Sequence, residues 1–192
     1  MQIDKEMKVV ILDIKDIFVN LPIQGILTTT KFWLYRNIHD NELIKRTLNI
    51  LEIIMIQNYF QYNERYLQPD KGIAMGSSIS STMAEIYLQY IEETYVKQWL
   101  ESKEIVYYKR CVDDILIIYD PNKANEQTIL EKINKIDQNL QFKIITEENN
   151  TINYLDITIY RNNNNIDIII YRKTTGTDTT TNFPRTTQTN IK

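Results

Sequence analysis

The chain has 192 residues, with 22 Lys and Arg against 25 Asp and Glu, so its formal net charge at pH 7 is −3. Hydrophobic residues make up 43% and charged residues 24%, a balance typical of a globular protein with one sizeable core. Cys111 is the only cysteine and His39 the only histidine, which excludes a disulfide scaffold, a cysteine-based zinc site and a multi-histidine metal site. An isoelectric point near 5.3 argues against a general nucleic-acid-binding module. No apolar run is long enough to span a membrane, and no signal peptide opens the chain.

The N-terminal part of the sequence predicts a strand and then two helices. Residues Lys8–Ile14 form a short apolar run rich in β-branched side chains, which predicts a buried strand. Asp40 can cap a helix over about 41–57. Apolar residues recur in that segment at helical spacing: Ile44, Leu48, Leu51 and Met55.

A hairpin and a further helix are expected next. Aromatic and polar residues alternate over Asn58–Gln68 on either side of Asn63-Glu64, a pattern that predicts a hairpin. The helix should begin among residues 77–81 and run to about Trp99, because apolar residues again recur at helical spacing.

The second half of the chain predicts mainly strands. They are expected over Glu104–Lys109, Ile115–Tyr119, Gln141–Thr146, Ile152–Tyr160 and Ile166–Lys173, with a helix over about 123–138. Helices on one face of a mainly antiparallel sheet is the simplest architecture for this order, an α+β, ferredoxin-like core. Residues 174–192 are rich in Thr and are expected to be poorly ordered.

Carboxylates stand at the ends of two apolar strands. Asp13 closes the first run, and Asp113-Asp114 lie at the tip of the hairpin between the strands that follow. An Asp pair in a tight turn is usually structural. If the two strands are neighbours, however, three carboxylates converge, and their repulsion is tolerated only where a cation is bound.

Oxygen ligands without His or Cys select a hard ion such as Mg²⁺ or Mn²⁺. Two such ions about 3.5–4 Å apart suit in-line phosphoryl transfer. An acidic cluster alone is also compatible with calcium binding or with a nuclease, so the neighbouring motifs have to decide.

Four motifs occur in order. They are LDIKDIFVNLP (Leu12–Pro22), YLQPDKGIAMGSSIS (Tyr66–Ser80), CVDDILIIYD (Cys111–Asp120) and FKIITEENNTINYLDITIYR (Phe142–Arg161) followed by YRKTTGTD (Tyr171–Asp178). Together they resemble the palm of a reverse transcriptase, most closely that of Penelope-like retroelements, from about Val9 to Lys173. The resemblance implies a polymerase-palm form of the ferredoxin-like, RRM-like core.

The resemblance assigns the metal site first. Asp13 and Asp113 would be the two main metal ligands, with Asp114 as the adjacent carboxylate and the Ile14 backbone carbonyl completing the ligand sphere. Phe18 would lie under the sugar of the incoming nucleotide, where a bulky ring excludes a 2′-hydroxyl. The alternative for Phe18 is a plain core aromatic.

The second motif would contact the nucleotide or the template. Gly72 and Gly76 would let the backbone approach the ligand closely, with Met75 and Ser77 beside them. Gln68 is a weaker candidate for the same contact. The alternative for both glycines is an ordinary turn.

Basic residues would meet the primer. Lys109 and Arg110 flank the acidic hairpin and would contact primer phosphates, unless they are simply solvated charges. Lys143 lies near the place where such palms carry a lysine that protonates the leaving pyrophosphate. The primer strand would be supported by Tyr171, Arg172 and Lys173, whose alternative is a solvated strand end.

The leading hypothesis is therefore the palm, over residues 1–173, of an RNA-directed DNA polymerase that joins a dNTP to a primer 3′-hydroxyl on an RNA template. Twelve residues precede Asp13 and the chain ends at Lys192, so fingers and thumb are expected to be absent and the chain alone inactive. Cys111 also replaces the tyrosine that usually precedes such a hairpin.

Two other hypotheses remain. The chain could be a truncated or decaying remnant of such an element, which folds but does not polymerise. An unrelated metal-binding α+β module would explain the acidic hairpin but not the other motifs. An intracellular protein, nuclear or cytoplasmic, with no membrane partner is expected in each case.

Overall fold

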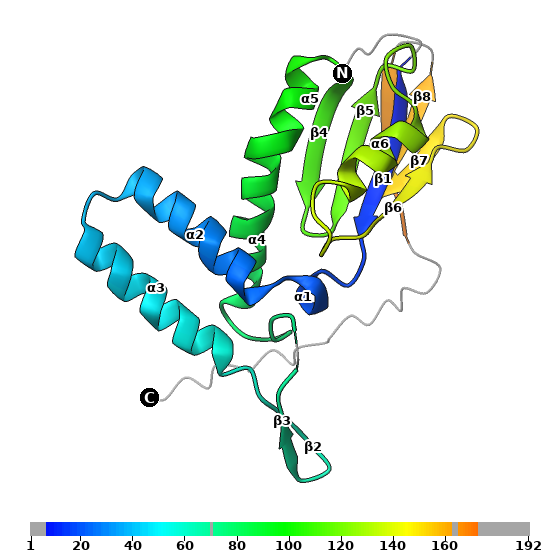
Figure 1. Cartoon of the computed structure of the whole chain (residues 1–192). Helices are drawn as coiled ribbons and strands as arrows, with labels where there is room; N and C mark the ends of the chain where they lie inside the picture. Colours follow the sequence, from blue (N-terminus) through cyan, green and yellow to red (C-terminus); the bar gives the residue numbers. More distant parts are fainter. Residues whose placement is uncertain (1–6, 70, 163–164, 173–192) are drawn as a thin grey trace, which may run out of the picture.

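A four-stranded antiparallel sheet lies at the centre of the chain, whose computed structural model describes residues 7–69, 71–162 and 165–172 (Figure 1). Its strands are β1 (Lys8–Ile14), β4 (Ile105–Cys111), β5 (Asp114–Tyr119) and β6 (Phe142–Thr146), in the order β4-β5-β1-β6. Helices fill the connections from β1 to β4 and from β5 to β6, which gives a ferredoxin-like arrangement. The predicted α+β class with a mainly antiparallel sheet is confirmed.

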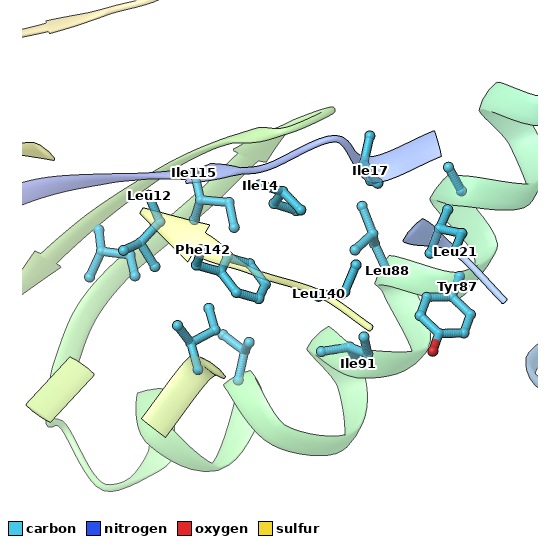
Figure 2. Packing of buried hydrophobic residues seen from close by; sticks show 14 of the residues in the cluster. Leu12, Ile14, Ile17, Leu21, Tyr87, Leu88, Ile91, Ile115, Leu140 and Phe142 are labelled. Atoms are coloured by element: carbon cyan, nitrogen blue, oxygen red, sulfur yellow. The ribbon is translucent and has the colours of Figure 1, made fainter. Parts of the chain in front are cut away.

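Helices cover one face of this sheet. The long helix is α4 (Ser80–Ile91), which continues through a π-helical turn, η1 (Glu92–Val96), into α5 (Lys97–Glu101). The short helix is α6 (Glu126–Asn134). Figure 2 shows Leu12 and Phe142 of the sheet in the same buried cluster as Ile91 of α4. Each large aliphatic side chain buried here stabilises the fold by about 1.5–3 kcal/mol.

A second, three-stranded sheet covers the opposite face. Its strands are β7 (Thr151–Tyr154), β8 (Ile157–Asn162) and β9 (Asn165–Ile170). Val9 and Ile11 of β1 are buried against residues of β7 and β8. Because both faces of β1 are covered, its residues 9–12 are all buried, which explains why the run has no polar alternation.

The remaining elements follow β1 and precede α4 in the sequence, and in space they extend away from the main sheet (Figure 1). They are α1 (Ile17–Asn20), α2 (Ile23–Asn37), α3 (Asn41–Ile56) and the hairpin of β2 (Phe60–Tyr62) and β3 (Arg65–Leu67). Asp40 caps α3 as predicted, since its Oδ1 accepts hydrogen bonds from the backbone N–H groups of Glu42 and Leu43 at 3.0 Å.

The hairpin turn is also where the sequence predicts it. Asn63 and Glu64 both have positive φ, of 47° and 61°, as the two central residues of a type I′ turn require. The strands β2 and β3 are exposed along their whole length.

Two predicted elements differ from the structure. The single strand expected over Ile152–Tyr160 is wrong, because the chain reverses after Tyr154 to form β7 and β8. The turn places Leu155 at a φ of 53°, and neither glycine nor asparagine marks it in the sequence. The helix expected over 123–138 is shorter at both ends, since α6 spans Glu126–Asn134. Its start is set by the Asn125 side chain, which caps the helix by accepting a hydrogen bond from the N–H of Thr128 at 2.8 Å.

The helix expected to end near Trp99 reaches Glu101, but with the π-helical turn inside it. Of the two helices expected before the hairpin, the sequence gives bounds only for the second, at about 41–57, and this is α3. The tail 174–192 lies outside the described residues. Within the described residues no helix is both long and apolar enough to cross a membrane.

Candidate active site

The register of the main sheet aligns four polar side chains at one end. Asp13 on β1 lies opposite Asp114 on β5 and opposite Lys143 on β6, and Asp114 in turn lies opposite Cys111 on β4. Residues directly opposite one another in antiparallel strands point to the same face. Cys111, Asp114, Asp13 and Lys143 therefore form a row across all four strands, called here the cross-sheet row.

The cross-sheet row lies on the face that carries β7–β9. Val9 and Ile11, which lie on the same face of β1 as Asp13, pack against that small sheet. Asp13 and Asp114 are half-buried, whereas Cys111 and Lys143 are exposed. The row is therefore accessible at the end of the strands, beyond the apolar contact between the two sheets.

The third carboxylate, that of Asp113, belongs to the turn between β4 and β5, next to Asp114. Val112 and Asp113 form this two-residue turn, and the Ile14 N–H donates to the Asp113 carbonyl oxygen at 3.0 Å. β1, which bears Asp13, and β5, which begins at Asp114, are neighbouring strands, as the sequence argument for a metal site required.

Val112 occupies an unfavourable backbone conformation. Its φ is 56°, in the left-handed region that β-branched residues rarely adopt. Such a residue costs about 1–3 kcal/mol and persists only where its surroundings enforce it, which is commonest at functional sites.

The donor chemistry of the site suits a hard divalent cation. Facing carboxylates such as those of Asp13 and Asp114 repel each other, and a cation bound between them relieves that repulsion. Their oxygens are the ligands that Mg²⁺ and Mn²⁺ prefer. Among the described residues, however, no group of three or more His, Cys, Asp or Glu side chains is already arranged to hold a metal ion.

Tyr154, to which the sequence assigned no role, lies beside the acidic hairpin. Its buried hydroxyl is 3.4 Å from the Asp114 backbone oxygen and 3.5 Å from that of Lys109. Burial raises the pKa of the Tyr154 hydroxyl, and the neighbouring Cys111 and Asp114 raise it further, so the group remains a hydrogen-bond donor. Only its place in the NYLD segment of the fourth motif pointed to it.

The loop of the second motif packs against α1, directly after β1. The Ile73 N–H donates to the Phe18 carbonyl oxygen at 2.8 Å. Gly72 has a φ of +86°, and a β-carbon there would lie 2.6 Å from the Val19 carbonyl oxygen. The close approach that Gly72 permits is thus to the backbone of α1. Phe18 is half-buried against the main core, as its alternative assignment expected.

Gly76 differs from Gly72 in its surroundings. Its φ is +94°, but a β-carbon at this position would meet open space. Met75 beside it is 69% exposed. Ser77 contributes to a cavity of about 210 Å³ between this loop, the end of α3 and α4. This part of the loop is therefore the part open to a ligand.

The Gln68 side chain makes a hydrogen bond to another part of the chain. Its Nε2 donates to the Ile56 carbonyl oxygen at 2.8 Å and so ties β3 to the end of α3.

The basic residues beside the acidic hairpin point in opposite directions. Lys109 is exposed on the face of the cross-sheet row. The Arg110 side chain, by contrast, is 5% exposed and bonded to Glu85 and Glu92 of the long helix. The expectation that Arg110 is a solvated charge is wrong, because its guanidinium lies on the helix-covered face.

The C-terminal candidates lie near the turn between β7 and β8. The Tyr171 N–H donates to the Asp156 carbonyl oxygen at 2.7 Å, two residues from Tyr154. Arg172 is exposed, and Lys173 lies outside the described residues.

Comparison with known proteins agrees with this geometry. The family described as "Reverse transcriptase (RNA-dependent DNA polymerase)" matches residues 1–159. No curated protein matches the chain.

Solved structures of similar fold include two yeast telomerases. The apo telomerase of Candida tropicalis, truncated from its C-terminal domain, has a TM-score of 0.61 and 15% identity, over 85% of this chain and 35% of its own. The telomerase of Candida albicans, in complex with a TWJ fragment of telomeric RNA, has a TM-score of 0.64 and 15% identity, over 86% of this chain and 32% of its own. At this identity the likeness concerns the fold. The chain spans about a third of the length of the telomerase chains it matches.

Proposed function

The chain belongs to the reverse transcriptase (RNA-dependent DNA polymerase) family, and we propose that it is the palm of such an enzyme, which transfers a nucleotidyl group from a dNTP to a primer 3′-hydroxyl. The observation that carries the proposal is the pairing of Asp13 with Asp114 across β1 and β5, with Asp113 hydrogen-bonded to the next residue of β1.

In this proposal Asp13 and Asp113 hold two Mg²⁺ or Mn²⁺ ions, with Asp114 and the Ile14 carbonyl as further ligands. Such ions, when bound, activate the primer hydroxyl and stabilise the leaving pyrophosphate. Lys143 lies opposite Asp13 on β6, which supports the proposal that its ammonium group gives a proton to the leaving group.

Nucleotide binding is assigned to the segments after β1 and before α4. Phe18 would lie under the sugar and select against a 2′-hydroxyl. Gly76, Met75 and Ser77 form the open part of the loop, which supports a contact with the nucleotide or template there. The roles of Gly72 and Gln68 would be indirect, since both hold this loop and its hairpin to α1 and α3.

Primer contacts are assigned to the exposed Lys109 and to the segment after β9. Tyr171 is joined to the β7–β8 turn, whose Tyr154 reaches the acidic hairpin, and this supports a role for Tyr171, Arg172 and Lys173 beside the primer end. Arg110 is not retained in this group, for the reason given above.

We propose an RNA template and a DNA primer as partners, because the family is described as RNA-dependent and one telomerase of similar fold is seen with telomeric RNA. The order of the four motifs supports a Penelope-like origin. We further propose that residues 1–173 form the palm, that 174–192 form a separate tail, and that fingers and thumb segments of a parent polymerase complete the enzyme.

The alternative is a remnant that folds without polymerising. The lack of a prearranged three-residue metal site within the described residues favours it.

Primer extension distinguishes the two. The chain is incubated, alone and within a polymerase that supplies fingers and thumb, with a DNA primer on an RNA template, dNTPs, and Mg²⁺ or Mn²⁺. Asp113→Asn should abolish extension, whereas Asp167→Asn, on exposed β9, should not. Extension that survives Asp113→Asn would contradict the two-metal assignment. No extension by the wild-type chain, together with Mn²⁺ binding that Asp113→Asn leaves unchanged, would support the remnant.

A further inference from the structure

All three guanidinium nitrogens of Arg110 donate hydrogen bonds to other groups of the protein. Its Nε donates to Glu92 at 2.6 Å, and its two terminal nitrogens donate to Glu85 at 2.8 and 2.9 Å, to Glu92 at 3.3 Å and to the Val112 carbonyl oxygen at 3.3 Å. An arginine has five N–H donors, and these contacts occupy all of them.

The two carboxylates come from the long helix that covers the sheet. Glu85 of α4 and Glu92, the first residue of η1, are separated by two helical turns and so lie on one face of the long helix. Tyr108 on β4 donates to Glu92 at 2.9 Å. Hydrogen bonds from Arg110 lower the pKa of Glu85, which keeps that carboxylate ionised at neutral pH.

The remaining hydrogen bond of Arg110 is made to the Val112–Asp113 turn between β4 and β5. The Val112 carbonyl belongs to the peptide group before Asp113, and Arg110 holds it. The Asp113 carbonyl belongs to the peptide group after it, and Ile14 holds that one at 3.0 Å. Both peptide groups that flank the Asp113 α-carbon thus accept a hydrogen bond, one from the Arg110 side chain and one from the backbone of β1.

The backbone at Val112 explains why such fixing is needed. Its φ of 56° is unfavourable for valine, so the turn would tend to relax if one support were removed. Relaxation of the Val112–Asp113 peptide would move the carboxylate that follows it.

We propose that Arg110, held by Glu85 and Glu92, is a positioning residue for Asp113 and sets the affinity of the site for its divalent cation. The inference rests on the proposed function, because it takes Asp113 as a metal ligand. It assigns the role of Arg110 to the metal site and not to primer phosphates.

The test uses the 192-residue chain and Mn²⁺ alone as the probe, with the free ion followed by electron paramagnetic resonance. Arg110→Lys keeps the charge but cannot make the forked contacts. Glu92→Gln removes one carboxylate and leaves Arg110 in place. Glu93→Gln is the matched control, since Glu93 is the next residue of the same turn and makes only 3.5 Å ion pairs with Arg36 and Lys97 in the described structure.

We expect Arg110→Lys and Glu92→Gln to raise the Mn²⁺ dissociation constant by about 10- to 100-fold, as loss of supporting contacts behind metal ligands does. Glu93→Gln should stay within about twofold, because exposed ion pairs contribute little. All variants are measured well below their unfolding temperatures, so a purely structural role would lower the unfolding temperature and leave the affinity unchanged.

Asp113→Asn separates this proposal from the proposed function. If it abolishes Mn²⁺ binding while folded Arg110→Lys and Glu92→Gln bind like wild type, the positioning role is wrong and the metal site stands. If Arg110→Lys does not fold, Glu92→Gln alone decides. If Asp113→Asn leaves Mn²⁺ binding unchanged, both proposals are overturned.

Discussion

The Tyr154 hydroxyl on β7 lies 3.4 Å from the backbone oxygen of Asp114 on β5, so the small sheet touches the main sheet at the base of the acidic hairpin. The contact is partly buried, and Tyr154 belongs to the apolar cluster that joins β7 and β8 to β1 and β5. This hydrogen bond holds β7, the strand after β6, beside the backbone of Asp114.

Tyr154→Phe should lower the free energy of unfolding by about 0.5–1.5 kcal/mol, the net value of one hydrogen bond. Urea denaturation followed by circular dichroism measures the change. Tyr160→Phe is the control, because Tyr160 on β8 is 36% exposed and should change stability much less. Equal effects of the two variants would show that the contact with the hairpin contributes nothing.

Gly72→Ala should be severely destabilising, by about 2–4 kcal/mol, because it combines a positive φ with a clash against backbone. The new β-carbon would lie 2.6 Å from the Val19 carbonyl oxygen and 2.7 Å from that of Phe18. Gly76→Ala shares the positive φ, of +94°, but has open space around it, and should cost only about 1 kcal/mol. Thermal unfolding of both variants isolates the clash, and similar losses would contradict the packing of the loop on α1.

Acid should weaken the fold partly through Glu85. Its hydrogen bonds to Arg110 lower its pKa from the ordinary 4.5, so its contribution is fully present above pH 4.5 and is lost as the pH falls through the folded-state pKa. Glu85→Gln should therefore be less stable than wild type at pH 7, with the difference shrinking below pH 4.5.

Urea denaturation across this pH range tests the sign. Glu93→Gln, which leaves the Arg110 contacts intact, is the reference variant. A stability difference between wild type and Glu85→Gln that grows toward acid would contradict the assignment.

Phe18→Val should raise incorporation of ribonucleotides relative to deoxynucleotides, because a smaller side chain leaves room for a 2′-hydroxyl. Primer extension with matched rNTP and dNTP pools, by a polymerase in which fingers and thumb complete this chain, measures the ratio. Phe32→Val on α2, where the ring is 41% exposed, controls for the loss of an aromatic side chain. If the ratio stays at its wild-type value, Phe18 is a core residue only.

The sequence was informative where local pattern and position coincide. The apolar run before Asp13 predicted β1 with its bounds, and the Asp40 cap and the Asn63-Glu64 turn are short-range signals that tertiary structure left unchanged. The reverse transcriptase family and the α+β core also follow from motifs that the chain carries in order.

Other features could not be read locally. Arg110 looks like a solvated charge in the sequence because its partners, Glu92 and Glu85, lie 18 and 25 residues earlier on a helix. The turn at Leu155 was missed because a leucine at positive φ leaves no compositional mark.

The strand order has a consequence for biosynthesis. β1 precedes both of its partners in the chain: β5 and β6 begin about 100 and about 130 residues after β1 ends. During translation the apolar Lys8–Ile14 segment therefore lacks both neighbouring strands until β5 and β6 have also been synthesised. Such non-local pairing is slow to form and exposes the segment to aggregation and to chaperones in the meantime. Asp13 can therefore pair with Asp114 only after β5 has been synthesised.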